Sequence, residues 1–587
     1  MEGFIAQLLE RYAVAIQRHS EYTENYNSLR LADALFDKVS LTQSHPDHPP
    51  QIVVLGPTQA GKSTLVNLLL DTAAAGISAL AGYTVHAQGF ASAGSEHSLQ
   101  PLETVLSPLT RTAAGTLTPE NLNVFTLEAV DSGAAAVCNH CVVWDTPDFD
   151  SIESQGYRGA VLKTTALADV VIVMLSKDKY GDKTVWEMLH LLNECRIPHL
   201  VCINKLDPDD ETAVVNSFKT RYLDTFSKEA PELLVIPYIA SSPNSSDSTN
   251  RVNRSVSDNT ISIPDATHTA LSLAVKHLLR QSDRSQRAES TQQFIKVHWN
   301  QWLSPVLEEN SAWQLWTEQV SEVLSIAMDD YDQRYLENPQ KYETFNKALA
   351  ELLTLLEIPG LAKGLAKTRS LVTWPARKLL GMGKQAFNPT GTHKDVDYEK
   401  DMLIQVSTQA LITLNSQVIQ QVNEGGPATH WWQALNGALN TQQPSIESRF
   451  AQQIEHYQHD FEPRIEEAAE RLYLKLKDQP ALLNTLRATR ATTDAAAVVL
   501  AVKSGGLAAA DLVIAPAMLS VTTLLTESVL GKYMDGVKKE LKEQQHELVE
   551  ITLFDRHVKQ PLLHLSESMD DPGVFGMANS AIPNPPR

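Results

Sequence analysis

Positive charge and cysteine are both scarce in this chain, and each shortage excludes a class of protein. Lysine and arginine number 49 against 70 aspartates and glutamates, which gives a formal net charge of −21. Because binding to phosphodiester backbones needs a basic surface, this balance argues against nucleic acid as the main partner. Only 4 of the 587 residues are cysteine, too few for the disulfide framework of a secreted domain, so we expect a reducing compartment.

Long apolar runs are missing as well. The most apolar stretches, 495–502 and 512–526, are shorter than the roughly 18–20 residues that span a bilayer. The N-terminus carries apolar residues at helical spacing rather than the apolar core of a signal peptide. We therefore predict a cytoplasmic protein. With 43% hydrophobic and 20% charged residues it should be globular, and 587 residues are too many for one core, so about two or three domains are expected.

Two of three short motifs predict a phosphate site. Residues 56–63 (GPTQAGKS) match G-x-x-x-x-G-K-[ST] and lie between the apolar run 52–55 and a helical pattern over 64–70. In such a loop the backbone N–H groups surround phosphates, Lys62 reaches the β- and γ-phosphates and Ser63 ligates Mg²⁺. Asp145 ends a second apolar run, where a phosphate-binding fold holds the same ion.

The third motif, 204–207 (NKLD), predicts which base is bound. The Asp207 carboxylate can accept two hydrogen bonds from guanine N1 and N2, which adenine cannot supply, and the Lys205 stem can cover the purine. Three motifs in order, each ending an apolar strand, predict that the chain binds GTP and GDP. The predicted nucleotide-binding residues are Gly56, Gln59, Ala60, Gly61, Lys62, Ser63, Thr64, Asn204, Lys205 and Asp207.

Changes of pattern predict four parts: an N-terminal helical segment (1–48), an α/β domain with a doubly wound, mostly parallel sheet (49–284), a large all-α domain (285–569) and a flexible tail (570–587). The apolar spacing over 446–476 predicts a long helix that Pro463 should break or kink. Further strands are expected at 123–129, 170–176 and 233–240, and helices at 154–168, 184–196, 212–227, 266–282 and 403–422.

With these motifs, the chain resembles the translation-factor-related class of P-loop GTPases, nearest the Era and dynamin-like groups. A helical segment before the GTPase domain and a helical region after it are similar to dynamin-like proteins and immunity-related GTPases. The resemblance implies a hydrolase that converts GTP to GDP with Mg²⁺, with Lys62, Gln59 and Asp145 as catalytic residues. It implies a homo-oligomer as a partner and a backbone contact from Ser241 to the guanine.

The chain departs from that family at the D-x-x-G motif, which reads 145–148 (DTPD). Asp148 replaces the glycine that senses the γ-phosphate, and Phe149 stands where Ras-like enzymes keep a water-orienting glutamine. In relatives the residue matching Gln59 helps to bind a monovalent cation such as K⁺; a role in shaping the loop is the alternative. We therefore expect slow hydrolysis that depends on stimulation.

The resemblance also implies a threonine that completes the Mg²⁺ shell. Residues 75–120 should carry an insertion in the first switch, and the threonine should lie shortly before the strand at 123. The candidate metal ligands are therefore Thr116 and Thr118, besides Ser63 and Asp145.

A basic segment in the second half is a candidate membrane contact. Residues 358–394 contain no Asp or Glu and seven Lys or Arg, interleaved with apolar side chains. Such a stretch suits an anionic bilayer surface, and docking on an acidic face of the same protein is the alternative. For 493–530 a hairpin in one leaflet and a buried bundle core both remain open.

We therefore expect a dynamin-like or membrane-associated regulatory GTPase, in the cytoplasm or at the inner face of a membrane. A ribosome- or RNA-assembly GTPase of Era type, and a GTP-dependent scaffold with negligible hydrolysis, are the alternatives.

Overall fold

The computed structural model divides the chain into two compact units. One comprises Met1–Pro305 with Met577–Arg587, and the other comprises Val306–Gly576. The structure describes residues 1–76, 84–92, 99–118, 120–138, 140–149, 154–206, 209–237, 265–339, 342–355, 398–426, 428–485, 525–528, 530–567, 569 and 574–585.

An eight-stranded sheet forms the centre of the first unit, as far as the residues are described. Its strand order is β3-β4-β2-β5-β1-β6-β7-β8, and every neighbouring pair is parallel except β2 with β5. This confirms the predicted doubly wound, mostly parallel sheet. The strands are β1 (Gln51–Leu55), β2 (Ala87–Ser92), β3 (Thr110–Arg111), β4 (Val124–Val130), β5 (Val142–Asp145), β6 (Val170–Ser176), β7 (His199–Leu206) and β8 (Leu233–Pro237).

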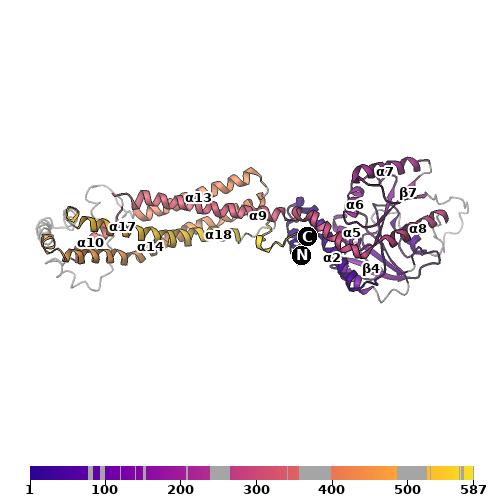
Figure 1. Cartoon of the computed structure of the whole chain (residues 1–587), viewed down its shortest axis with the longest axis horizontal. Helices are drawn as coiled ribbons and strands as arrows, with labels where there is room; N and C mark the ends of the chain where they lie inside the picture. Colours follow the sequence, from indigo (N-terminus) through magenta and orange to yellow (C-terminus); the bar gives the residue numbers. More distant parts are fainter. Residues whose placement is uncertain are drawn as a thin grey trace. The chain divides into compact units, whose positions relative to one another are not determined.

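Helices cover both faces of this sheet (Figure 1). Ile52 and Val54 share a core with α3 (Lys62–Leu70) and α8 (Asp265–Gln281), because alternate residues of a strand face the same side. On the other side α5 (Ser154–Leu167) packs against β1 and β2, and is in turn covered by α2 (Thr23–Ser44) and α4 (Gln100–Leu106). Helices α6 (Lys183–Glu194) and α7 (Glu211–Phe226) belong to the same unit.

The N-terminal helices belong to the same unit as the sheet. Helix α1 (Glu2–Ala15) packs on α2, and both contact the first part of α9 (Arg287–Tyr331). The Tyr12 hydroxyl donates to the backbone oxygen of Trp302 (2.9 Å), whose indole N–H donates to Ser28 Oγ (2.8 Å).

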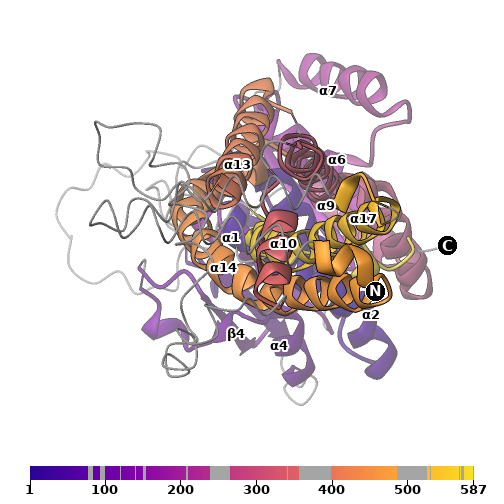
Figure 2. The same cartoon turned by 90° about the vertical axis from the view of Figure 1, so that its left-hand side faces the viewer.

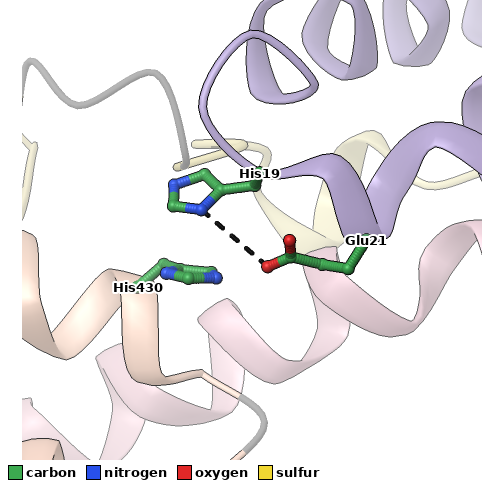
Figure 3. A group of neighbouring side chains, drawn as sticks. All are labelled: His19, Glu21 and His430. Atoms are coloured by element: carbon green, nitrogen blue, oxygen red, sulfur yellow. Dashed lines mark ion pairs between the residues drawn. The ribbon is translucent and has the colours of Figure 1, made fainter.

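Between α1 and α2, His19 Nδ1 lies 3.8 Å from Glu21 Oε1 (Figure 3). His430, also drawn there, belongs to the second unit. One imidazole and one carboxylate are too few ligands for a metal site.

The second unit is a helical bundle, as predicted. Its helices share one apolar core and lie side by side (Figure 1, Figure 2), and no strand occurs among the residues described there. The elements are the rest of α9, η6 (Asp332–Leu336), α10 (Thr344–Leu355), α13 (Tyr398–Glu424), α14 (Thr429–Lys477), α17 (Gly531–Leu548), η7 (Val549–Lys559) and α18 (Gln560–Glu567).

Of the break or kink predicted at Pro463, the break is wrong, because α14 continues through both Pro444 and Pro463. An internal proline costs a helix about 3 kcal/mol. Buried Phe450 and Tyr457, between the two prolines, are part of the core packing that outweighs this cost.

The two candidate membrane segments are not part of this description. Residues 358–394 lie outside the described residues, and so do all of 493–530 except 525–528 and 530. Among the helices that are described, none has an apolar stretch long enough to cross a membrane. Within the expected tail (570–587), Phe575 is buried, and its N–H donates to Glu309 Oε1 (2.7 Å).

Candidate nucleotide-binding site

The loop between β1 and α3 has a backbone that only glycine fits at two positions. Gly61 has φ of +102°, and a Cβ there would lie 2.5 Å from Asn204 Nδ2. A Cβ on Gly56 would lie 2.5 Å from the backbone oxygen of Met174 in β6. The loop is therefore pressed against β6 and β7, so that its backbone can approach a ligand closely.

Beside this loop, Ser63 and Asp145 form a pair. Register places Val54 opposite Asp145, so the end of β5 lies next to the start of the loop. Ser63 Oγ donates to Asp145 Oδ2 (2.6 Å), while Asp145 Oδ1 is buried without a hydrogen-bond partner among the described residues. Burial raises the pKa of Asp145 to about 6. A hydroxyl beside a carboxylate with one unsatisfied oxygen is a donor set that Mg²⁺ accepts.

Lys62 forms an ion pair with a carboxylate of the same chain. Its ammonium pairs with Asp148, and both side chains are almost completely buried. The ammonium also donates to the backbone oxygen of Pro57 (3.3 Å). The residue that replaces the glycine of D-x-x-G thus points at the phosphate-binding lysine. Phe149, its neighbour, is buried.

The base-recognition motif is bonded directly to the phosphate loop. Asn204 Nδ2 donates to the backbone oxygen of Ala60 (3.0 Å), and Lys205 Nζ donates to that of Gln59 (2.9 Å). Thr64 follows Ser63 in the first turn of α3. The structure therefore brings together ten predicted residues: Gly56, Gln59, Ala60, Gly61, Lys62, Ser63, Thr64, Asp145, Asn204 and Lys205. Asp207 and Ser241 lie outside the described residues.

The topology does not bring Thr116 or Thr118 to this site. Both are exposed, and Thr116 Oγ1 is bonded locally to Thr112 Oγ1 (2.6 Å) and to the backbone oxygen of Ala113 (2.7 Å). They follow β3, which three strands separate from β1. At about 4.8 Å per strand, the two strands lie roughly 19 Å apart.

The sequence pattern placed the switch threonine shortly before the strand at 123, which is β4 in the structure. The strand that lies antiparallel beside β5 is β2, whose Gln88 pairs with Asp145, and not β4. Thr84 lies just before β2 and is buried, at the same edge of the sheet as Ser63. The extra elements α4 and β3 follow β2 rather than precede it. The sequence pattern did not predict β2, because alanine and glycine, which make up half of it, carry little strand preference.

Comparisons with known proteins agree with this geometry. The family described as 50S ribosome-binding GTPase matches residues 51–205. A search of curated protein sequences finds no match.

Two solved structures also align with the chain, each of an oligomerised bacterial dynamin pair described as a mechanism for long-range sensing and tethering of membranes. One is 11% identical over 93% of this chain and 92% of that chain, with a TM-score of 0.37. The other is 12% identical over 93% and 91%, with a TM-score of 0.32. TM-scores this low do not establish a common fold.

The family match covers β1, the glycine loop, β5 and the start of the base-recognition motif. In the structure these elements meet at one edge of the sheet, around Lys62 and the Ser63–Asp145 pair. Residues 51–205 therefore match a GTPase family and form a P-loop nucleotide-binding fold, and a large helical unit follows them along the chain.

Proposed function

We propose that this chain binds GTP together with Mg²⁺ and hydrolyses it to GDP. The observation that supports this most directly is the Ser63–Asp145 pair with its unsatisfied Asp145 oxygen, next to a lysine and a glycine loop. These are the parts from which phosphoryl-transfer sites are built.

Each part has a separate role in this proposal. The loop N–H groups and Lys62 hold the phosphates and neutralise the charge that develops on them. Ser63 and Asp145 would hold Mg²⁺, which supplies charge neutralisation on the β- and γ-phosphates. Thr84, rather than Thr116 or Thr118, is our proposed switch threonine, because it precedes the strand beside Asp145.

Hydrolysis should be slow without stimulation. The residue after Asp148 is the buried Phe149, which cannot orient a water molecule. Gln59 remains a candidate for a K⁺ contact. Its backbone, with φ of +61°, presents its oxygen to Lys205.

We further propose that the nucleotide state is coupled to self-assembly or to a membrane surface, as in a dynamin-like GTPase. Supporting this are the helical unit that follows the GTPase domain and the basic segment 358–394. Seven basic residues near an anionic bilayer would contribute about 1 kcal/mol each. The protein would then act in the cytoplasm or at the inner face of a membrane.

A GTP-dependent scaffold with negligible hydrolysis is the second candidate, and the Lys62–Asp148 pair favours it. An Era-type role in ribosome or RNA assembly has less support, because the net charge of −21 opposes binding to RNA.

Turnover of GTP by the purified full-length protein tests these proposals. It should be measured in K⁺ and in Na⁺ buffer, with and without anionic liposomes, and the Lys62→Ala protein is the blank. Turnover that liposomes stimulate and the mutation abolishes would support the membrane-coupled GTPase. Tight GTP binding without turnover in any condition would instead favour the scaffold.

A further inference from the structure

Lys62 is the cation on which a nucleotide's phosphates depend, yet in this structure its ionic partner is part of the same chain. The Asp148 carboxylate pairs with the Lys62 ammonium in a largely dry environment, where both side chains are less than one tenth exposed. No other ion pair of Asp148 occurs among the described residues of the first unit.

The position of Asp148 is fixed by its neighbours. It follows β5 by three residues, and Thr146 between them donates through Oγ1 to the backbone oxygen of Val54 (2.7 Å). This bond holds the turn after β5 against the start of the phosphate loop. The turn therefore delivers the carboxylate to the phosphate-binding lysine.

We propose that Asp148 is a specificity-determining residue that makes the site favour GDP over GTP. The inference rests on the proposed function. An aspartate in the γ-phosphate-sensing position is an internal anion that competes with the γ-phosphate for Lys62. GDP lacks that phosphate, so its β-phosphate can lie in the loop while the carboxylate stays close.

The physical basis is repulsion between like charges at short range. Two anions that share one ammonium in a poorly hydrated site destabilise each other, whereas an anion and a neutral amide do not. GTP must therefore displace the carboxylate from a buried position or accept its charge nearby. Replacing Asp148 by a neutral residue removes this cost for GTP and changes little for GDP.

Fluorescence titration with N-methylanthraniloyl-labelled GDP and a labelled non-hydrolysable GTP analogue tests the proposal. The full-length proteins compared are the wild type, Asp148→Asn and Asp148→Gly, with Mg²⁺ present. Asp224→Asn removes an equal charge from an exposed position on α7 and serves as the matched control. Lys62→Ala reports signal that does not come from the site, and thermal unfolding confirms that each variant is folded.

We expect both Asp148 variants to bind the GTP analogue about tenfold or more tightly than the wild type does, with GDP affinity changed by less than about threefold. Asp224→Asn should change neither affinity. Equal gains for both nucleotides would overturn the proposal, since Asp148 would then only block the site. Weaker binding of both would overturn it too, by showing that the carboxylate supports the loop.

The two proposals fail differently. If the wild type binds neither nucleotide and the Asp148 variants also bind neither, guanine-nucleotide binding itself is refuted and the inference falls with it. If GDP binds in a manner that depends on Lys62 while the preference for GDP is unaffected by Asp148, only this inference is refuted.

Discussion

Gly61 illustrates, at the scale of the residue, how close contact between motifs restricts the chain. Its left-handed backbone and its approach to Asn204 leave no room for a Cβ. The phosphate loop and the base-recognition motif are thus joined by packing as well as by the Asn204–Ala60 hydrogen bond. A change in one motif should therefore disturb the other.

Replacing Gly61 by alanine should weaken binding of GDP by about tenfold or more, because of backbone strain and the clash with Asn204. Fluorescence titration with labelled GDP measures this. Gly437→Ala is the control: its Cβ would meet nothing within 4 Å, and it lies inside α14. It should leave binding intact and stabilise the second unit by about 0.5–1 kcal/mol. Full affinity in Gly61→Ala would contradict the described loop.

Thr84→Ala and Thr116→Ala form a matched pair for the switch. If Thr84 completes the metal shell, its loss should reduce GTP turnover by about a hundredfold, since elements that stabilise the transition state contribute on that scale. Thr116→Ala should leave turnover unchanged. Discontinuous assays of phosphate release compare the turnover of the two variants. Loss of turnover in Thr116→Ala but not in Thr84→Ala would instead identify Thr116, which the sequence pattern had favoured, as the switch threonine.

A buried ionic network at the base of the sheet contains the clearest titrating group. Lys38 Nζ lies 3.1 Å from Asp169 Oδ1, and Arg284 Nη2 lies 2.9 Å from Asp169 Oδ2. His48 is buried beside them, with Nε2 3.4 Å from Lys38 Nζ and Nδ1 2.9 Å from the backbone oxygen of Pro49. Burial, with the neighbouring Lys38 charge, lowers the pKa of His48 to about 4.

This network predicts a loss of stability in mild acid. Between pH 6.5 and 4 the unfolded chain binds a proton at His48 that the folded chain does not, so the free energy of unfolding should fall as pH falls, by on the order of 3 kcal/mol. Asp145, whose pKa is raised to about 6, acts in the opposite direction over part of this range. The difference between wild type and His48→Asn in urea unfolding at pH 7.5 and pH 5 isolates the histidine. Parallel losses in both proteins would argue against it.

At the scale of the element, the sequence predicted the strands that consist of uninterrupted apolar runs. It did not predict β2, in which small residues interrupt the apolar pattern. Strands β1, β5, β6 and β7 are buried along nearly their whole length, and their β-branched residues identified them. Strand β2 alternates alanine and glycine with larger residues. Alanine and glycine carry little strand preference. The stability of β2 comes from pairing with β4 and β5, and pairing is not visible in a local pattern. For that reason the sequence pattern suggested Thr116 and Thr118 and not Thr84.

Four helical elements of the bundle meet at one carboxylate, and no periodicity argument could have found it. Glu399 of α13 accepts hydrogen bonds from Tyr331 (2.9 Å), Tyr335 (3.4 Å), Tyr457 (2.8 Å) and Gln545 (2.6 Å), which lie on α9, η6, α14 and α17 respectively. A carboxylate with four donors is well satisfied although buried.

Glu399→Ala should destabilise the second unit by about 3 kcal/mol or more, because it leaves several buried donors without an acceptor. Glu424→Ala removes an exposed glutamate from the same helix and should cost less than about 0.5 kcal/mol. Chemical denaturation followed by circular dichroism compares them. Similar costs for the two substitutions would show that the network contributes little.

At the scale of the whole molecule, the chain divides into two compact units, and the described residues of each contain an apolar core. One joins the sheet with α3 and α8, and the other joins the helices from α9 to α18. We therefore expect two calorimetric transitions. GDP with Mg²⁺ at about a hundredfold excess over its dissociation constant should stabilise the first unit by about 2.7 kcal/mol. Lys62→Ala should abolish this shift. A single transition that moves as a whole would contradict two independently cooperative cores.

The order of residues along the chain has a consequence for biosynthesis. Apart from Met577–Arg587, the first unit consists of residues up to Pro305, and the second unit begins only afterwards. Every described residue of the nucleotide site, and Arg284 of the buried ionic network, is therefore translated before the bundle. Since domains fold as units from the N-terminus during synthesis, the nascent GTPase domain should meet cellular guanine nucleotides before its helical unit exists. Each newly synthesised molecule would then already have a nucleotide bound when its helical unit folds.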